Sequence, residues 1–336
     1  MKKIGITTTV PIEVLIAAGY EVIDLNNVFV CSKDYLKYID KAEKEGFPKS
    51  CCAWKKAMYS VVLEEGIEEI VGVTEGDCSN TKALEEVLSM KGIKVHPFAY
   101  PQSHKIEDIK KSIDEFMESF NVSIEQVEAA RQRLNVIRTS IIRLDELTYK
   151  EGKTSGFENH LYQVSASDFN SNPDKFEDDL VAKIHEIEKR PSNFKGLRLG
   201  YIGVPPMTVD IYDFVEKFQA DIIYNEVQRE FSFPRFKDAK NIYEQYQDYT
   251  YPYNINYRIK EIEKQILERN LDGIIHYTQA FCYKQIEDIV IKNHIKIPII
   301  TIEGDKLNYL DARSKLRLEA FLDMVKDQKE MRANGK

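Results

Sequence analysis

Five cysteines have the most distinctive chemistry in this sequence: Cys31, Cys51, Cys52, Cys78 and Cys282. A chain of 336 residues can build its core without disulfide staples, so we expect these side chains to be thiols. Thiolates bind soft metals and iron-sulfur clusters. Because the sequence contains no Cys-x-x-Cys pair, a structural zinc site and a ferredoxin-type motif are both unsupported.

Three of the cysteines stand at junctions between expected strands and helices. Cys52 opens a helical stretch, Cys78 follows the apolar strand at 70–73, and Cys282 follows the strand expected at 273–277. In open α/β sheets, ligands bind in the crevice at the carboxyl ends of the strands. A helix N-terminus also favours negative charge and so lowers the pKa of a nearby thiol. These three thiols could converge on one ligand, and the alternative for each is buried packing.

The other two cysteines carry weaker signals. Cys31 follows the apolar run Val28-Phe29-Val30, and we predict that it is buried packing. Cys51 forms only a vicinal pair with Cys52. Neither position by itself indicates a ligand.

Composition is that of a folded globular protein. Hydrophobic residues make up 43% of the chain, charged residues 30%, and the formal net charge is -8. This acidic balance offers no overall positive field for nucleic-acid phosphates. No stretch approaches the roughly 20 apolar residues that cross a bilayer, and the first residues do not form a signal peptide. We therefore expect a soluble, cytoplasmic protein that binds neither nucleic acid nor membrane.

Hydrophobic patterning predicts an α/β fold in which the same alternation occurs twice. In the first part we expect strands at 3–8, 21–25, 70–73 and 94–98 and helices at 11–18, 35–45, 53–65 and 81–90. In the last part we expect strands at 197–202, 221–224, 273–277 and 298–302 and helices at 210–218, 260–269, 285–293 and 312–326. Strands this apolar are usually covered on both faces, which favours parallel sheets.

Residues 105–190 have helical spacing that no convincing strand interrupts. We therefore predict a first Rossmann-like domain over residues 1–104, a helical connection over 105–193 and a second Rossmann-like domain over 194–336. Six tyrosines crowd residues 243–257, a segment too polar for a core helix. We expect an ordered loop that packs its rings on the second domain, with a substrate lid or a dimer contact as alternatives.

Three titratable residues near expected strand ends are candidate catalytic groups: Glu75, Glu226 and His276. They could orient a substrate or move protons. The alternative is a structural role in helix capping, turn hydrogen bonds or ion pairs. Lys55, in the first turn after Cys52, could neutralise an anionic cluster or face the solvent.

Short segments in a fixed order, spread over nearly the whole chain, point to a known family. In the first half they are Thr7 to Val14, Asp24 to Asn27, Gly46 to Pro48, Cys52 to Lys55 and Gly76 to Thr81. In the second half they are Gly203 to Pro206, Asn225 to Arg229, His276-Tyr277 with Phe281-Cys282, Ile302 to Asp305 and Asp311 to Arg313. Together these segments resemble the family of 2-hydroxyacyl-CoA dehydratase and benzoyl-CoA reductase subunits, particularly its compact branch that includes the double-cubane cluster protein.

The resemblance implies two Rossmann-like domains with an iron-sulfur cluster in the cleft between them, held by Cys52, Cys78 and Cys282. Three protein thiolates leave one iron of a 4Fe-4S cubane open, so water, hydroxide or a substrate oxygen could complete its coordination. The implied enzyme is a dehydratase or reductase of a small molecule. In the family, an ATP-hydrolysing activator with its own iron-sulfur cluster injects one low-potential electron, and the dehydratase makes a ketyl radical that expels hydroxide. A related second subunit or a second copy of the chain is the other implied partner.

Two departures from the family pattern define alternative functions. The sequence begins close to its first strand, whereas many larger dehydratase subunits carry an additional amino-terminal helical region. The first alternative is therefore a homodimeric reductase with a double-cubane 8Fe-9S cluster that does not use CoA thioesters. Five cysteines fall short of the six thiolates that two cubanes would need if each kept three, so we favour a single 4Fe-4S cluster. The second alternative is a non-catalytic two-domain protein that binds a ligand or carries a cluster.

Overall fold

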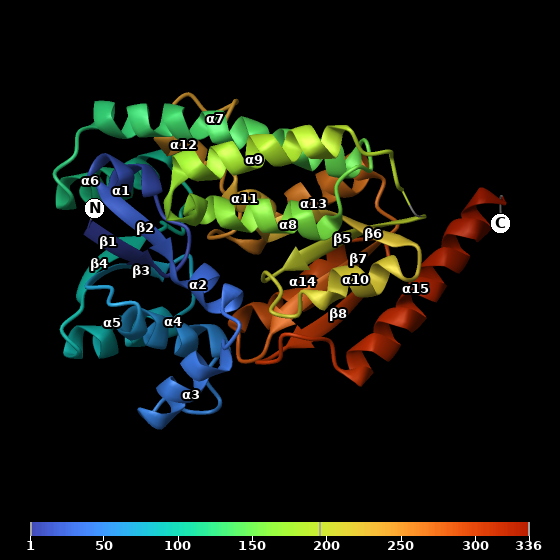
Figure 1. Cartoon of the computed structure of the whole chain (residues 1–336), viewed down its shortest axis with the longest axis horizontal. Coiled ribbons are helices and arrows are strands. Elements are labelled where there is room, and N and C mark those ends of the chain that lie inside the picture. The colour runs from blue at the N-terminus through green and yellow to red at the C-terminus, as the bar shows by residue number, and fades with distance from the viewer. Residues whose placement is uncertain (1, 195, 335–336) are drawn as a thin grey trace. The chain divides into compact units, whose positions relative to one another are not determined.

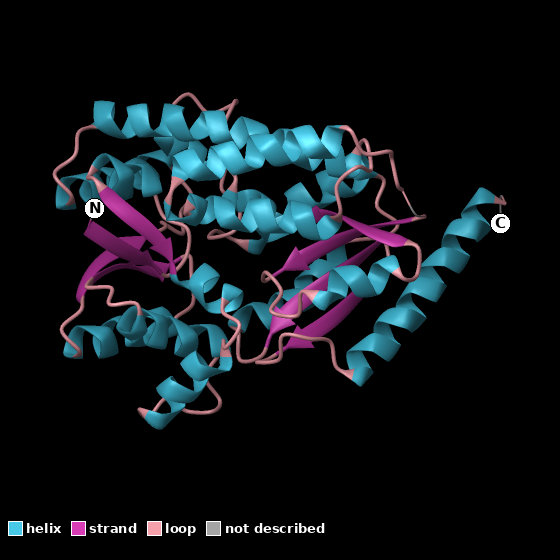
Figure 2. Ribbon diagram, in the orientation of Figure 1, coloured by secondary structure: helices cyan, strands magenta, loops and turns pink. Residues whose placement is uncertain are grey.

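Two sets of apolar strands form two separate parallel sheets, drawn as magenta arrows in Figure 2. The structure is a computed structural model that describes residues 2–194 and 196–334. The sheets belong to two units, each assembled from separate chain segments. Unit 1 takes the residues up to 141 with 164–180 and 230–254, and unit 2 takes 142–163, 181–229 and the residues from 255 on. The predicted α/β fold with two Rossmann-like sheets is confirmed, and the division at residues 104 and 193 stays a prediction.

The sheet of unit 1 has the strand order β2-β1-β3-β4. Its strands are β1 (Lys2–Ile6), β2 (Tyr20–Asp24), β3 (Glu69–Glu75) and β4 (Lys94–Ala99). After β1 the chain adds β2 on one side of that strand and later adds β3 on the other side. The carboxyl ends of β1 and β3 therefore flank the point where the strand order reverses. Ligands of doubly wound folds bind at such a point.

Helices cover both faces of this sheet, which explains why its central strands are apolar throughout. Figure 1 shows α1 and α6 over one face and α4 and α5 over the other. The helices of this part of the chain are α1 (Ile12–Ala17), α2 (Leu25–Cys31), α3 (Leu36–Lys44), α4 (Ala53–Glu64), α5 (Asn80–Met90) and α6 (Ile106–Ser119).

Residues 105–193, all of which the structure describes, contain helices and no strand, as the sequence pattern predicts. After α6 come α7 (Ile124–Tyr149), α8 (Gly156–Val164), two short 3-10 turns η1 (Ser165–Ser167) and η2 (Phe169–Ser171), and α9 (Pro173–Glu188). No helix in the described part of the chain is both long enough and apolar enough to cross a bilayer.

The sheet of unit 2 repeats the same topology with the order β6-β5-β7-β8. Its strands are β5 (Leu197–Gly203), β6 (Ala220–Asn225), β7 (Gly273–Gln279) and β8 (Ile299–Gly304). One face packs with α10 (Asp210–Glu216) and α15 (Ala312–Ala333), and the other packs with α13 (Ile255–Arg269) and α14 (Glu287–His294). The order reverses between β5 and β7, so β7 occupies the place in unit 2 that β3 occupies in unit 1.

All eight predicted strands are confirmed, with ends that agree within two residues. Three short helices are absent from the prediction: α2, α11 (Glu226–Phe231) and α12 (Ile242–Gln247). Each has six or seven residues, too few for a helical period to become visible in the sequence. The two helices that follow strands directly, α2 and α11, begin at the residue after the strand ends.

The tyrosine-rich segment differs in part from its prediction: the rings of Tyr246 and Tyr249 contact Phe233, within the predicted second domain, but residues 230–254 belong to unit 1. Tyr246 is fully buried, and its hydroxyl donates to the carbonyl of Val10 at 2.7 Å. The rings of Tyr249 and Tyr253 contact that of Tyr100, which follows β4. Tyrosine satisfies such a site because its ring is apolar while its hydroxyl can reach a carbonyl.

A buried carboxylate, Glu13 of α1, ties α1, α7 and α12 together in unit 1. Arg138 of α7 donates to its Oε1 at 2.9 Å, and neither side chain is exposed. Gln245 also donates to Oε1, at 2.9 Å, and the one hydroxyl proton of Tyr246 is shared between Oε2 at 2.8 Å and the Val10 carbonyl. A charge without access to water is tolerable only when it is paired and hydrogen-bonded, and here both oxygens are occupied.

Two buried carboxyl groups, those of Asp24 and Asp168, lie together at the carboxyl end of β2. Asp168 accepts the backbone N–H of Asp24 at 2.7 Å, and both side chains are buried. Burial raises the pKa of Asp168 to about 7, and the charge of Asp24 adds to this rise against hydrogen bonds from the Asp24 and Asn170 backbones.

This pair should make stability depend on pH. Because its pKa is higher in the folded than in the unfolded state, Asp168 contributes stability that is full below about pH 4 and lost as the pH rises through about 7. Urea unfolding should show a lower unfolding free energy at pH 8 than at pH 5, by up to about 3 kcal/mol from this residue. Asp168→Asn should flatten the dependence, while Asp323→Asn on an exposed position of α15 should keep it. The same pH dependence in Asp168→Asn as in the wild type would refute the assignment.

Candidate functional site

In unit 1, Cys52 is the N-cap residue of α4. It is buried, and every residue of the helix from Ala53 to Val62 is buried as well. A helix surrounded by protein also buries its polar side chains, and α4 buries two lysines. Lys55 and Lys56 are 4% and 3% exposed. The thiol of Cys52 thus lies at a positive helix end that also carries two buried ammonium groups.

Cys78 stands in the turn between β3 and α5, at the point where the strand order reverses. The turn begins at Gly76, whose φ of +89° suits glycine. A Cβ at this residue would lie 2.8 Å from the Cβ atoms of Tyr100 and Pro252, so only glycine fits. The carbonyl of Cys78 accepts the backbone N–H of Thr81 at 2.9 Å, and the cysteine itself is half-buried.

An ion pair connects the two cysteine positions of unit 1. Lys55 Nζ lies 2.8 Å from Asp77 Oδ2, the residue before Cys78, and Thr81 Oγ1 donates to the same oxygen at 2.9 Å. Burial by itself would lower the pKa of Lys55, but Asp77, followed by Cys78 and Cys52, raises it above its ordinary value. Lys55 therefore keeps its charge beside both thiols.

The remaining two cysteines differ from each other. Burial raises the pKa of Cys51, with Lys56 opposing this effect and Cys78 adding to it. Cys31, which we predict to be buried, is exposed. It is the last residue of α2, a helix whose buried side consists of Leu25 and Phe29.

In unit 2, Cys282 follows β7 and precedes the 3-10 turn η3 (Tyr283–Ile286). It is half-buried, and its backbone N–H donates to the carbonyl of Gln279 at 3.0 Å. Phe281 has a φ of +63°, which is unusual for a residue with a side chain. Because β7 is the counterpart of β3, Cys282 and Cys78 occupy equivalent places in their sheets.

A buried lysine also accompanies the cysteine of unit 2. Burial lowers the pKa of Lys284, and the charge of Arg258 adds to this effect, while Glu287, Cys282 and Glu226 oppose it. Lys284 Nζ lies 3.6 Å from Glu287 Oε1. This lysine is absent from the sequence prediction, although its place two residues after Cys282 is a signal comparable to that of Lys55 after Cys52.

The three candidate catalytic residues have different surroundings. Glu75 ends β3 and is exposed. Glu226 is buried and accepts two hydrogen bonds from Arg258, at 2.7 and 2.9 Å, and one from the backbone of Gly203 at 2.9 Å. This is the geometry of a carboxylate that holds α11, α13 and the end of β5 together.

His276 lies on β7 and is buried, with Nδ1 2.7 Å from Asp288 Oδ1. Burial would raise the pKa of Asp288, but hydrogen bonds from His276, Lys292 and Thr301 lower it below its ordinary value. A Cβ at Gly203 would lie 2.2 Å from the Tyr277 carbonyl oxygen and 3.2 Å from His276 Nε2, so this close approach of the backbone to β7 admits only glycine.

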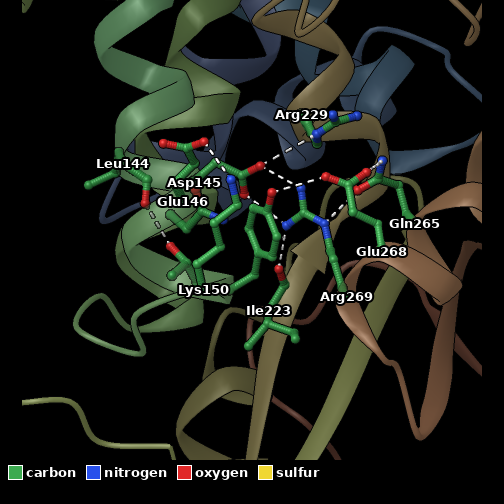
Figure 3. A network of polar contacts seen from close by, with 12 residues as sticks. Leu144, Asp145, Glu146, Lys150, Ile223, Arg229, Gln265, Glu268 and Arg269 are labelled. Atoms are coloured by element: carbon green, nitrogen blue, oxygen red, sulfur yellow. Dashed lines mark hydrogen bonds and ion pairs between the residues drawn. The ribbon is translucent and has the colours of Figure 1, made fainter.

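A network of polar contacts in unit 2 fixes the helices that carry Glu226 and Arg258 (Figure 3). Arg269 of α13 is buried and donates to both oxygens of Asp145, at 3.0 and 2.5 Å, and to the carbonyl of Ile223 at 2.7 Å. Arg229 of α11 pairs with Glu261 of α13 at 2.8 Å. These contacts hold β6, α11 and α13 together.

The predicted ligands divide between the units: Cys52 and Cys78 belong to unit 1 and Cys282 to unit 2. Within residues 2–194 and 196–334, no group of three His, Cys, Asp or Glu side chains is arranged to hold a metal ion. Inside unit 1 the structure associates Cys52 and Cys78 with Lys55, and inside unit 2 it associates Cys282 with Lys284.

Comparison with known families gives one match. The sequence matches the family described as 2-hydroxyglutaryl-CoA dehydratase, D-component, over residues 7–325. The matched range includes all five cysteines. No curated protein matches the chain.

The Lys55–Asp77 pair should contribute strongly to the stability of unit 1. Lys55→Met leaves the Asp77 carboxylate without its counter-ion, which we expect to cost about 3 kcal/mol of unfolding free energy. Lys91→Met removes an exposed lysine that pairs with Glu45 and should cost little. Urea unfolding of the two variants measures the difference, and equal losses would contradict the role of the buried pair.

The turn before Cys78 should be specific for glycine. Gly76→Ala introduces both an unfavourable φ and two close contacts, whereas Gly92→Ala, at a φ of +84° with open space, introduces only the first. We expect about 1–2 kcal/mol of destabilisation for Gly92→Ala and at least about 1 kcal/mol more for Gly76→Ala. Thermal unfolding compares them, and a Gly76→Ala variant no less stable than Gly92→Ala would argue against this packing.

Proposed function

Because the chain belongs to the family of 2-hydroxyglutaryl-CoA dehydratase D-components, we propose that it is the cluster-bearing component of a 2-hydroxyacyl-CoA dehydratase. The match covers nearly the whole chain, so the family gives a dehydratase-type enzyme component as the starting point. The finer proposal is that Cys52, Cys78 and Cys282 hold a 4Fe-4S cluster. The observation that supports it is the equivalent placement of Cys78 after β3 and Cys282 after β7, with a buried lysine, Lys55 or Lys284, near the thiol in each unit.

The donor chemistry of unit 1 suits such a cluster. Thiolates are the usual protein ligands of iron-sulfur clusters, and a cluster held by thiolates is anionic. Cys52 at a helix N-terminus and Cys78 beside Lys55 both lie where negative charge is favoured. In our proposal Lys55 stays protonated and balances the charge of the ligands, while Asp77 fixes its position.

Unit 2 would contribute the third ligand and the proton chemistry. Cys282 follows β7, and the positive charge of Arg258 acts on Lys284, two residues after this cysteine. When bound, the cluster supplies a Lewis-acidic iron and a store for one electron. Glu226, held by Arg258 and the Gly203 backbone, would orient the Arg258 guanidinium rather than accept a proton.

We propose His276 as the residue that moves a proton. Its Nδ1–H donates to Asp288, so the lone pair is on Nε2, and Asp288 would stabilise the imidazolium that forms when Nε2 accepts a proton. Glu75 remains a weaker candidate, because it is exposed at the end of β3.

The proposed partners follow from the family. An ATP-hydrolysing activator with its own iron-sulfur cluster would deliver the low-potential electron, and a related second subunit or a second copy of the chain would complete the enzyme. The substrate would be a small 2-hydroxyacyl compound.

Iron analysis tests the ligand assignment. After anaerobic reconstitution, we expect about four irons and four acid-labile sulfides per wild-type chain. Cys78→Ala should lose most of this iron, because it removes one of three ligands, while Cys31→Ala, at an exposed position, should keep it.

The outcomes separate the functions. Full iron in Cys78→Ala would contradict the ligand set. About eight irons per wild-type chain would favour the double-cubane reductase. No iron in a well-folded wild-type chain would favour a protein that binds its ligand without a cluster.

A further inference from the structure

The inner face of α8 carries buried polar groups that lack partners. Asn159 and Gln163 are one turn apart, so they lie on the same face of the helix, and both are fully buried. Among the described residues, neither Nε2 nor Oε1 of Gln163 has a hydrogen-bond partner. Oδ1 of Asn159 lacks a partner as well. Buried amides are nearly always hydrogen-bonded, because an unpaired one keeps its full desolvation cost.

Two further side chains extend this group across to α11. Gln228 is fully buried and lies with its Nε2 3.2 Å from Nδ1 of His160, which is on α8 beside Asn159. The other end of the Gln228 amide, Oε1, has no hydrogen-bond partner. The ring of His160 packs 5.3 Å from that of Tyr212, which fixes its orientation.

The groups offer a defined set of donors and acceptors. Because Gln228 donates to Nδ1 of His160, the neutral ring carries its proton on Nε2, and the unpartnered atoms are those of the three amides. Gln163 adds two N–H donors and one acceptor, and Asn159 and Gln228 add one acceptor each. An occupant must therefore both donate and accept hydrogen bonds, as a hydroxyl or a carboxamide does.

The site carries no net charge. Burial lowers the pKa of His160 to about 3, so the ring is neutral at physiological pH. The nearest carboxylate, Asp145, accepts from Asn159 but is already paired with Arg269. Arg269 and Arg229 are already paired with Asp145 and Glu261, so a charged occupant would have to take its counter-ion from one of these pairs, and burying it would cost more than its hydrogen bonds return.

We propose that Asn159, His160, Gln163 and Gln228 form a binding site for a small uncharged molecule that carries a hydroxyl or carboxamide group. Ordered water has the same hydrogen-bonding chemistry, and the test separates the two sources. The site needs neither the cluster nor the activator, so it stands independently of the proposed function.

Stability is the first test, with the full chain. If Gln163 has no occupant, Gln163→Met removes an unpaired amide and should raise the melting temperature; if it is occupied, the variant should lower it. Gln265→Met is the matched control, because Gln265 is equally buried in unit 2 and its amide is fully used by Glu261, Glu268 and Arg269. We expect both variants to melt lower than the wild type, and a higher melting temperature for Gln163→Met would overturn the proposal.

Titration with lactamide, followed by the ring nitrogen resonances of His160, identifies the occupant. The spectrum of His160→Gln assigns the signal. We expect lactamide to shift it and lactate, which has a similar size but a negative charge, to leave it unchanged. Gln163→Met should weaken lactamide binding about tenfold, the effect of one hydrogen bond. No response to lactamide, with a lowered melting temperature in Gln163→Met, would identify water as the sole occupant and overturn the ligand assignment.

Discussion

The architecture of unit 1 depends on a single carboxylate that water does not reach. Glu13 is satisfied by Arg138, Gln245 and Tyr246, which come from two other segments of the chain. Removing one member of such a group leaves the others buried without a partner, which typically costs about 3–5 kcal/mol. The charge therefore specifies which segments must meet, and apolar packing alone would be less selective.

That constraint extends to the turn that carries Cys78. The segment that Gln245 and Tyr246 anchor continues to Pro252, which packs against Gly76. Tyr100 fills the other side of the glycine and donates its hydroxyl to the carbonyl of Thr9, close to the start of α1. The position of the Cys78 thiol is thus set by residues that lie far apart in the sequence and are joined through Glu13 and its neighbours.

Sequence reasoning succeeds where a local pattern is long enough to carry information. Apolar strands bounded by turns locate the eight strands, and the family resemblance agrees with the family match. Sequence reasoning fails where a property depends on segments that are far apart in the chain. The apolar run before Cys31 suggests burial, but α2 turns that cysteine outward. Tyr246, Tyr249 and Tyr253 contact residues more than a hundred positions earlier. The association of Lys55 with Asp77 and of Glu226 with Arg258 likewise depends on charges that no local spacing reveals.

The three-segment construction of unit 1 also has a consequence for its synthesis on the ribosome. Glu13 leaves the ribosome 232 residues before Gln245. At about 5–20 residues per second, its partners follow on the order of ten to fifty seconds later. During that interval the segment that carries Tyr246 and Pro252 has not yet been made. The turn containing Cys78 therefore lacks its contact with Pro252. In the nascent chain the turn that carries Cys78 therefore forms before Pro252, one of the two residues that pack against Gly76, has been made.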